Sequence, residues 1–195
     1  MRNNKALCRA AAFITAILFL NSSCKKNNAD STGGNTGKAT VSFTVDGDGM
    51  VNQSVSINAA AGSTGNESIY NSKWNFTHGV VADNKTKFSF YTNGQQTGQQ
   101  KLGTDFSNTN GPFTNVSIIL EMVEADGTQR TYIYEDKTYA GNPLPPGSNI
   151  NITKYEEVGG SVEGDFQGAL FNNENLAIIK LSNGHFKIPR SKDVK

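Results

Sequence analysis

The stretch GGSVEGDFQGALFNNENLAIIKLSNGHFKIPR, residues 159–190, decides the fold class. From Gly160 to Leu170 its even-numbered positions are small or apolar, whereas the odd-numbered positions up to Gln167 are polar. A helix over these residues would hold three interior glycines, each costing about 1 kcal/mol relative to alanine. Alternation with a period of two is instead typical of a strand with one buried face. We therefore predict a strand in which Phe166 is buried and Asp165 and Gln167 face water.

The same alternation recurs upstream, separated by turns rich in glycine, asparagine and aspartate. About nine or ten strands without an amphipathic helix predict an all-β fold, most simply an antiparallel β-sandwich. A partly open or lipocalin-like β-barrel is the alternative. We expect one β-domain over residues 39–190, followed by a tail at residues 191–195. The proline-rich PLPPG at 143–147 cannot continue a central strand, so we expect it to cross between sheets. The clearest strands are ATVSFTV at 39–45, VNQSVSIN at 51–58 and KFSFYT at 87–92.

A hairpin is predicted in VSIILEMVEADGTQRTYIY, residues 116–134. Asp126 and Gly127 between two apolar runs indicate a two-residue type I′ loop, because both central residues of that turn need positive φ. This register gives one apolar face and one polar face. We interpret Glu121 and Arg130 on the polar face as a solvated ion pair. The apolar face contains Ile118, Leu120, Met122 and Ile133. The polar face contains Glu121, Arg130 and Tyr132.

The C-terminal stretch resembles the last part of small uncharacterised Bacteroidetes lipoproteins. In those proteins a G-x-F-x-G strand precedes a closing strand with an I-T-N-G-x-F motif. Here Gly164-Asp165-Phe166-Gln167-Gly168 matches the first motif, and LSNGHF, 181–186, stands in place of the second. The resemblance covers about 35 residues. It implies an all-β fold and export, and it brings no assigned activity.

The N-terminus has the pattern of an export signal. A basic start is followed by an apolar run from Ala10 to Leu20, which is shorter than the roughly 20 residues that span a bilayer. Ser22 and Ser23 precede Cys24, and this arrangement resembles the lipobox of bacterial lipoproteins, although Asn21 stands where leucine is usual. The resemblance implies that residues 1–23 are a signal peptide and that Cys24 is lipidated.

The net charge and the number of cysteines limit which partners and which disulfides the exported domain can have. Removal of residues 1–23 takes away three basic and no acidic side chains, so the formal net charge of +1 becomes −2. A near-neutral domain gives no electrostatic footprint for nucleic acid. The only other cysteine, Cys8, lies within the signal peptide. The exported domain therefore has no internal disulfide and depends on its core.

A polar linker follows the anchor at residues 24–38. Its side chains are almost all polar, so it cannot bury enough apolar surface to order itself. The tripeptide DST at 30–32 resembles Bacteroidetes O-glycosylation sites, with Ser31 as the acceptor. In Bacteroidetes lipoproteins, acidic residues just after the cysteine accompany export to the cell surface. Here Lys25 and Lys26 follow Cys24 instead, so the resemblance implies the periplasmic face of the outer membrane.

No pattern in the domain indicates catalysis or a cofactor. His78 and His185 are the only histidines, and no cysteine accompanies them, so we predict no metal site. We expect His185 to face solvent and His78 to lie at a strand end. Asp46-Gly47-Asp48-Gly49 begins like a calcium loop, but Met50 replaces the next oxygen ligand, so we predict a hairpin turn. We therefore predict no catalytic residue, no cofactor and no enzyme activity.

Four aromatic residues are the candidates for ligand contact: Tyr70, Trp74, Tyr132 and Tyr134. Alternation places Tyr70 and Trp74 on one strand face, and we expect Trp74 to belong to the core. Three functions remain open. The first is a lipid-anchored envelope protein with a structural or accessory role. The second is a glycan- or peptide-binding module that uses exposed aromatics, and the third is a lipocalin-like carrier of an apolar ligand.

Overall fold

The computed structural model describes residues 37–60, 65–105, 114–124, 126–134, 147–172 and 174–195. Residues 33–195 form one compact unit, which contains every described strand. Cys24, Ser31 and residues 143–146 of the proline-rich segment lie outside the described residues.

The described residues form twelve strands and no helix, so the predicted all-β class is confirmed. Among the described residues, no helix has the length and apolar character needed to cross a membrane. The strands are β1 (Ala39–Gly47), β2 (Met50–Ala59), β3 (Ser68–Asn71), β4 (Phe76–Ala82), β5 (Thr86–Asn93), β6 (Gly98–Lys101), β7 (Gly103–Asp105), β8 (Thr114–Val123), β9 (Gln129–Ile133), β10 (Asn149–Tyr155), β11 (Ser161–Asn172) and β12 (Ile178–Val194).

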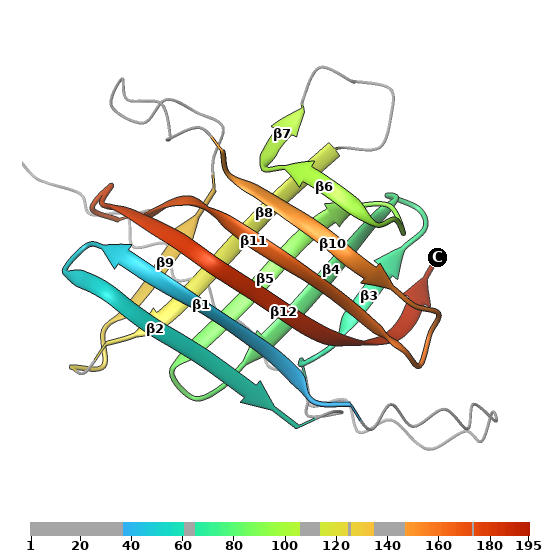
Figure 1. Cartoon of the computed structure of the whole chain (residues 1–195), viewed down its shortest axis with the longest axis horizontal. Coiled ribbons are helices and arrows are strands. Elements are labelled where there is room, and N and C mark those ends of the chain that lie inside the picture. The colour runs from blue at the N-terminus through green and yellow to red at the C-terminus, as the bar shows by residue number, and fades with distance from the viewer. Residues whose placement is uncertain (1–36, 61–64, 106–113, 125, 135–146, 173) are drawn as a thin grey trace, which may run out of the picture. The chain divides into compact units, whose positions relative to one another are not determined.

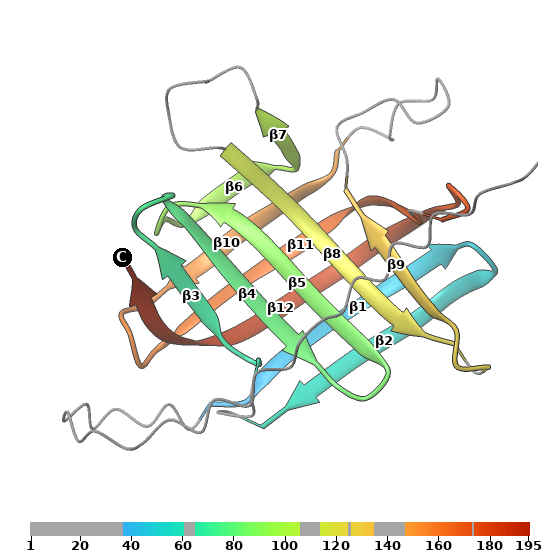
Figure 2. The same cartoon turned by 180° about the vertical axis from the view of Figure 1, so that it is seen from behind.

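The strands lie in two layers (Figures 1 and 2). The front layer has the order β2-β1-β12-β11-β10-β6, and the back layer has the order β3-β4-β5-β8-β9, with β7 beside β8. Pairing continues between the layers, because β12 also pairs with β3 and β11 also pairs with β9. The arrangement agrees with the predicted sandwich. It is mixed rather than wholly antiparallel, because β12 and β3 run parallel.

The predicted tail at residues 191–195 is wrong, because β12 continues to Val194. Up to Pro189 this strand pairs with β1 and β11, and its last residues pair with β3. Arg190 marks the crossing and is only 3% exposed. Its guanidinium donates hydrogen bonds to the Glu156 carbonyl (2.7 Å) and to Asp193 (2.6 Å), and it lies 4.9 Å from the Tyr155 ring centroid. These contacts hold the C-terminal residues in the sheet.

The core between the layers is built from phenylalanine rings opposite glycines. Phe166 pairs with Gly184, and Phe186 pairs with Gly164, on adjacent strands of the front layer. A Cβ atom at Gly184 would lie 2.6 Å from the Phe166 ring, and one at Gly164 would lie 2.7 Å from the Phe186 ring. The missing side chains therefore leave the space that the rings occupy. Phe166 is buried as predicted, and its ring lies 4.6 Å from that of Phe88 in the back layer.

The β1–β2 turn confirms the prediction of a hairpin at residues 46–49. Asp48 and Gly49 have φ values of 49° and 85°, as a type I′ turn requires. The β8–β9 hairpin is shifted by one residue from the prediction, and Leu120 pairs with Tyr132. The Gly127 amide donates to the Glu124 carbonyl, and Gly127 has a φ of 87°, so the loop has three residues instead of two. A one-residue shift moves every following side chain to the other face.

Candidate functional site

The outer face of the front layer carries polar side chains in rows that cross the strands. One row follows the cross-strand pairs Gln99–Asn151, Asn151–Asp165 and Asp165–His185 over β6, β10, β11 and β12. Because residues that pair across strands share a face of the sheet, all four side chains project outward. The row continues over β1 and β2 through Ser42 and Ser56.

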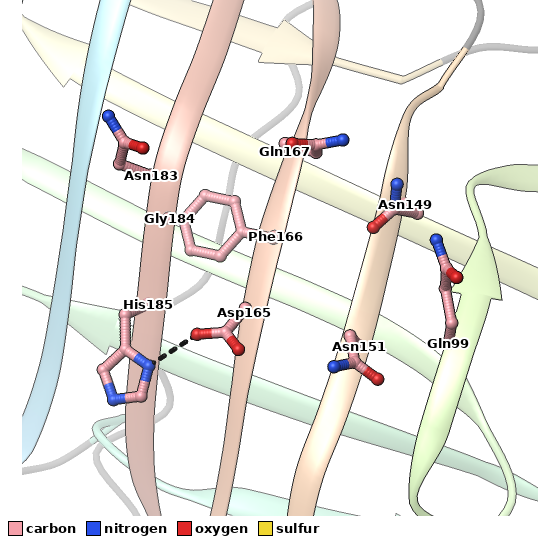
Figure 3. A pocket seen from close by; sticks show the side chains of 9 residues that line it. All are labelled: Gln99, Asn149, Asn151, Asp165, Phe166, Gln167, Asn183, Gly184 and His185. Atoms are coloured by element: carbon pink, nitrogen blue, oxygen red, sulfur yellow. Dashed lines mark hydrogen bonds and ion pairs between the residues drawn. The ribbon is translucent and has the colours of Figure 1, made fainter.

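These rows surround a hollow of about 570 Å³, which we call the amide hollow. Figure 3 shows its side chains spread over four neighbouring strands. Carboxamides make up most of its polar lining. The lining residues are Gln99, Asn149, Asn151, Asp165, Phe166, Gln167, Asn183, Gly184 and His185.

A β-bulge in β12 shapes the amide hollow. Asn183 has a φ of 52°, and the pairing of β12 with both β1 and β11 shifts by one residue beside it. A bulge redirects a side chain within a strand, and here Asn183 is exposed on the outer face. Next to it, Gly184 has no side chain and lies against Phe166, which is packed in the core from the other side. The missing Cβ of Gly184 makes room for that ring on the inner face, whereas on the outer face the displaced Asn183 borders the hollow.

The carboxamides in the hollow have unused hydrogen-bonding capacity. Among the described residues, the side chains of Gln99, Asn151, Gln167 and Asn183 form no hydrogen bond. Only Asn149 is engaged, through a 2.8 Å bond from its Nδ2 to the Gly147 carbonyl. Each carboxamide offers two donor hydrogens and an acceptor oxygen. The hollow can therefore both donate to and accept from a ligand at several points.

Asp165 and His185 contact each other within the hollow. His185 Nδ1 lies 2.9 Å from Asp165 Oδ1, and both side chains are more than half exposed. The remaining oxygen of Asp165 can accept from a ligand. None of the nine lining residues is a serine, threonine or cysteine, so the hollow contains no side-chain nucleophile of the kind that a histidine activates. Its chemistry favours binding rather than covalent catalysis.

A second hollow, of about 700 Å³, lies where the β1–β2 and β8–β9 turns meet. Oδ2 of Asp48 accepts hydrogen bonds there from Arg130 (2.8 Å), Tyr132 (2.8 Å) and Asn172 (3.3 Å). Desolvation acts to raise the Asp48 pKa, but these three donors outweigh it and hold the pKa below its ordinary value. Burial, with the bond to Asp48, raises the pKa of Tyr132 to about 12. The Asp48 carboxylate and its three donors satisfy one another's hydrogen-bonding capacity. We therefore assign these residues a structural role, which is to connect the two layers.

The structure does not bring the four aromatic candidates together. Trp74 is 44% exposed in the β3–β4 turn, so the prediction that it belongs to the core is wrong. The strand ends at Asn71, whose side chain accepts from the Trp74 amide at 3.1 Å and stabilises a turn instead. Tyr70 is half-buried beside it and donates to Asn75 at 3.0 Å.

The other two tyrosines lie on β9 or just after it, and three strands, β4, β5 and β8, separate β9 from β3. Tyr132 is 1% exposed and belongs to the core, a correction that follows from the one-residue shift of the hairpin. Tyr134 is partly buried against the same core. The shift also separates Glu121 from Arg130, which pairs with Asp48 and Glu124, while Glu121 pairs with Lys87 at 2.7 Å. The predicted ion pair is therefore wrong.

The histidines do not form a metal site in the described part of the chain, where no three of the residue types His, Cys, Asp and Glu group together. His185 faces solvent as predicted. His78 lies inside β4 rather than at its end, and its ring stacks on Tyr91 with centroids 4.3 Å apart. Burial lowers its pKa, with a smaller contribution from Lys87.

The amide hollow was not predicted from sequence. Its lining residues come from four strands between residues 99 and 185, so no local sequence motif indicates the hollow. A partial signal was present in the polar positions of two strands: Asn149 and Asn151 in β10, and Asp165 and Gln167 in β11. Their pairing across the sheet could not be deduced from the sequence.

Comparison with family models, with curated proteins and with solved structures finds no match to this chain.

Proposed function

We propose that this chain is an exported lipoprotein, anchored through Cys24, whose β-domain binds a neutral glycan in the amide hollow. The observation that carries the binding proposal is the group of four unpartnered carboxamides on adjacent strands. Sugar hydroxyls both donate and accept, and carboxamides match them on both counts. The proposal includes no catalytic step.

The position of the carboxamides on paired strands supports recognition. Asn151 and Asp165 are directly paired residues of β10 and β11, so the backbone ladder fixes their spacing. Sites on strands are held more precisely than sites on loops. Such a site loses less conformational entropy when a ligand binds, which favours affinity.

The other functions have less support. Phe43, Phe88, Phe166 and Phe186 pack against one another between the layers, and they fill the space that a carrier would keep for an apolar ligand. The exposed aromatic residue Trp74 has the Lys73 ammonium 5.2 Å from its ring centroid and lies in a turn away from the hollow. A purely structural role makes no use of the carboxamide arrangement.

The anchor proposal rests on the N-terminal sequence. The polar linker predicted from sequence at residues 25–38 separates Cys24 from β1, and a flexible chain of 14 residues would reach about 20 Å on average. A domain on such a linker can clear the lipid head groups and turn toward a ligand. We place it at the outer membrane, on the periplasmic face, with the bilayer as its partner through the lipid.

Glycan binding can be tested on residues 33–195, a compact unit with its own core. The probes are three neutral polysaccharides, mannan, xylan and dextran, in affinity electrophoresis followed by calorimetry. We expect retention by at least one of them, and a loss of about tenfold or more in affinity in Asn151→Ala and Asp165→Ala, equivalent to one strong hydrogen bond.

Asn58→Ala is the matched control. It removes a carboxamide from the same outer face of the sheet, but on β2 and outside the hollow. Its affinity should equal that of the parent. Absence of retention on all three polysaccharides, or equal losses in the hollow variants and the control, would overturn the proposal.

The anchor is tested by Cys24→Ser in the full chain. Because stable attachment needs more than one acyl chain, loss of the acylated residue should move the protein from the membrane fraction to the soluble fraction. A mature protein that begins at a residue other than Cys24, or an unchanged distribution, would refute lipidation while leaving glycan binding untouched.

A further inference from the structure

The strand β2 forms an exposed edge of the front layer. It is the last strand in the pairing order and pairs only with β1 in the described part of the chain. The opposite end of the order is β6, which has only four residues and ends in Lys101. A long edge strand leaves a row of backbone N–H and C=O groups available for another chain.

The β2 edge also lacks the devices that protect edges. Its ten residues, MVNQSVSINA, include no charged residue and no proline. Its one irregularity lies near the β1–β2 turn, where Asn52 has a φ of 45° and the pairing with β1 shifts. Beyond it, Gln53–Ala59 pair with β1 without interruption. Seven regular, neutral residues therefore face outward along the edge.

This segment is complementary to itself in the antiparallel direction. With a two-fold axis at Ser56, all seven residues find partners and Ser56 meets its own copy. Ser54 and Asn58, both exposed on the outer face, would then pair as hydroxyl and amide. On the inner face, half-buried Val55 would meet Ile57 of the second copy, which extends the core across the axis. Because neither copy is charged here, no repulsion opposes the pairing.

We propose that two copies of this chain pair through their β2 edges about this axis, which joins their front layers into one continuous sheet. Two-fold dimers of this isologous kind are the commonest homo-oligomers. The polar rows then continue from one copy to the other. Two amide hollows would share one face, a consequence that rests on the proposed function, whereas the dimer itself does not.

The first test compares two lysine substitutions in residues 33–195 by light scattering after size exclusion, over a dilution series. Ser56→Lys places two like charges at the axis and should give a monomer. Ser42→Lys is the matched control, because Ser42 is exposed on the same face and pairs with Ser56 one strand inside the edge. The parent and the control should both be dimeric.

Two results would overturn the proposal: a parent that is monomeric throughout the series, or a control as monomeric as Ser56→Lys. Polysaccharide binding is measured on the Ser56→Lys variant as well. If this variant binds polysaccharide, the amide hollow works without the dimer, so a failure of the dimer proposal is distinguished from a failure of the proposed function.

The second test uses the absence of cysteine from residues 33–195. Ser56→Cys brings two thiols together across the axis, so mild oxidation should convert the protein to a disulfide-linked dimer. Ser42→Cys, one strand away from the edge, should remain uncrosslinked under the same conditions. Equal crosslinking of the two variants would indicate random collision and would contradict the proposed axis.

Discussion

The inner and outer faces of the front layer use the same strands for different purposes. In β11, Phe166 belongs to the core, whereas its neighbours Asp165 and Gln167 line the amide hollow. The inner face is closely packed, and the phenylalanine rings lie against glycines of the adjacent strand. The outer face is open, and four of the carboxamides in its hollow, those of Gln99, Asn151, Gln167 and Asn183, have no protein partners among the described residues. Neighbouring residues of one strand therefore have different roles. Substitutions on the inner face should change stability, and substitutions on the outer face should change binding.

The largest effect is expected from Phe166→Ala on the inner face. This ring contacts those of Phe43, Phe88 and Phe186, with centroids 4.6 to 6.3 Å apart. Its removal leaves a cavity between the two layers, so the free energy of unfolding should fall by about 3–5 kcal/mol. Urea titration of residues 33–195 measures this loss. A change below about 1 kcal/mol would contradict the packing described here.

The next effect comes from adding a methyl group to the same face. In Gly164→Ala the new Cβ would lie 2.7 Å from the Phe186 ring and 2.5 Å from the Asn151 carbonyl. Overpacking of this kind costs about 1–3 kcal/mol. In a Phe186→Leu background the ring is gone, so Gly164→Ala should cost less there. A double-mutant cycle measures the difference, and strict additivity would show that the ring is not the obstacle.

A smaller effect is expected on the outer face from Glu163→Gln. Glu163 lies 2.9 Å from Lys187 and 3.4 Å from Lys154, and the bond to Lys187 is the main cause that lowers its pKa. A lowered folded-state pKa stabilises the fold above the ordinary carboxyl pKa, and this contribution is lost as the pH falls.

We therefore expect Glu163→Gln to destabilise by about 1 kcal/mol or less at pH 7. The difference from the parent should shrink near pH 3 or in strong salt. Urea titrations at the two pH values measure it. A difference that does not change with pH would assign the loss to packing rather than to charge.

The smallest effect on stability belongs to Gln167→Ala, the immediate neighbour of Phe166. Its side chain is exposed and unpartnered among the described residues, so the free energy of unfolding should stay within about 0.5 kcal/mol of the parent. The same variant should weaken polysaccharide binding. A large stability loss here, comparable to that of Phe166→Ala, would remove the distinction between the two faces.

Prediction from sequence succeeded where a strand's own alternation decides the outcome. The burial of Phe166 follows from β11 alone, and the β1–β2 turn follows from its Asp-Gly pair. It failed where the outcome depends on a partner or on loop length. An Asp-Gly pair suits both two- and three-residue hairpins, and the choice between them moved Tyr132 into the core. Residues 191–194 lack alternation and become a strand only because β3 pairs with them.

The amide hollow shows the same limit at the level of function. Polar alternation in β10 and β11 indicates an exposed face, but their adjacency depends on the order of strands in the sheet. The β12 bulge that displaces Asn183 is likewise absent from any local pattern, because a bulge is defined by the strands beside it. A site built from several distant strands therefore becomes visible only with the fold.

The long C-terminal strand has a consequence for how the protein is made. β12 is the last of the described strands to leave the ribosome, yet it pairs with β1, β11 and β3. Until β12 has been made, one of the two connections between the layers and the partner that β1 and β11 share are missing, and pairing over such sequence distances is slow. The front layer can therefore be completed only after β12 has been made. Removal of residues 191–194 would also remove most of the pairing with β3, so we expect it to destabilise the domain.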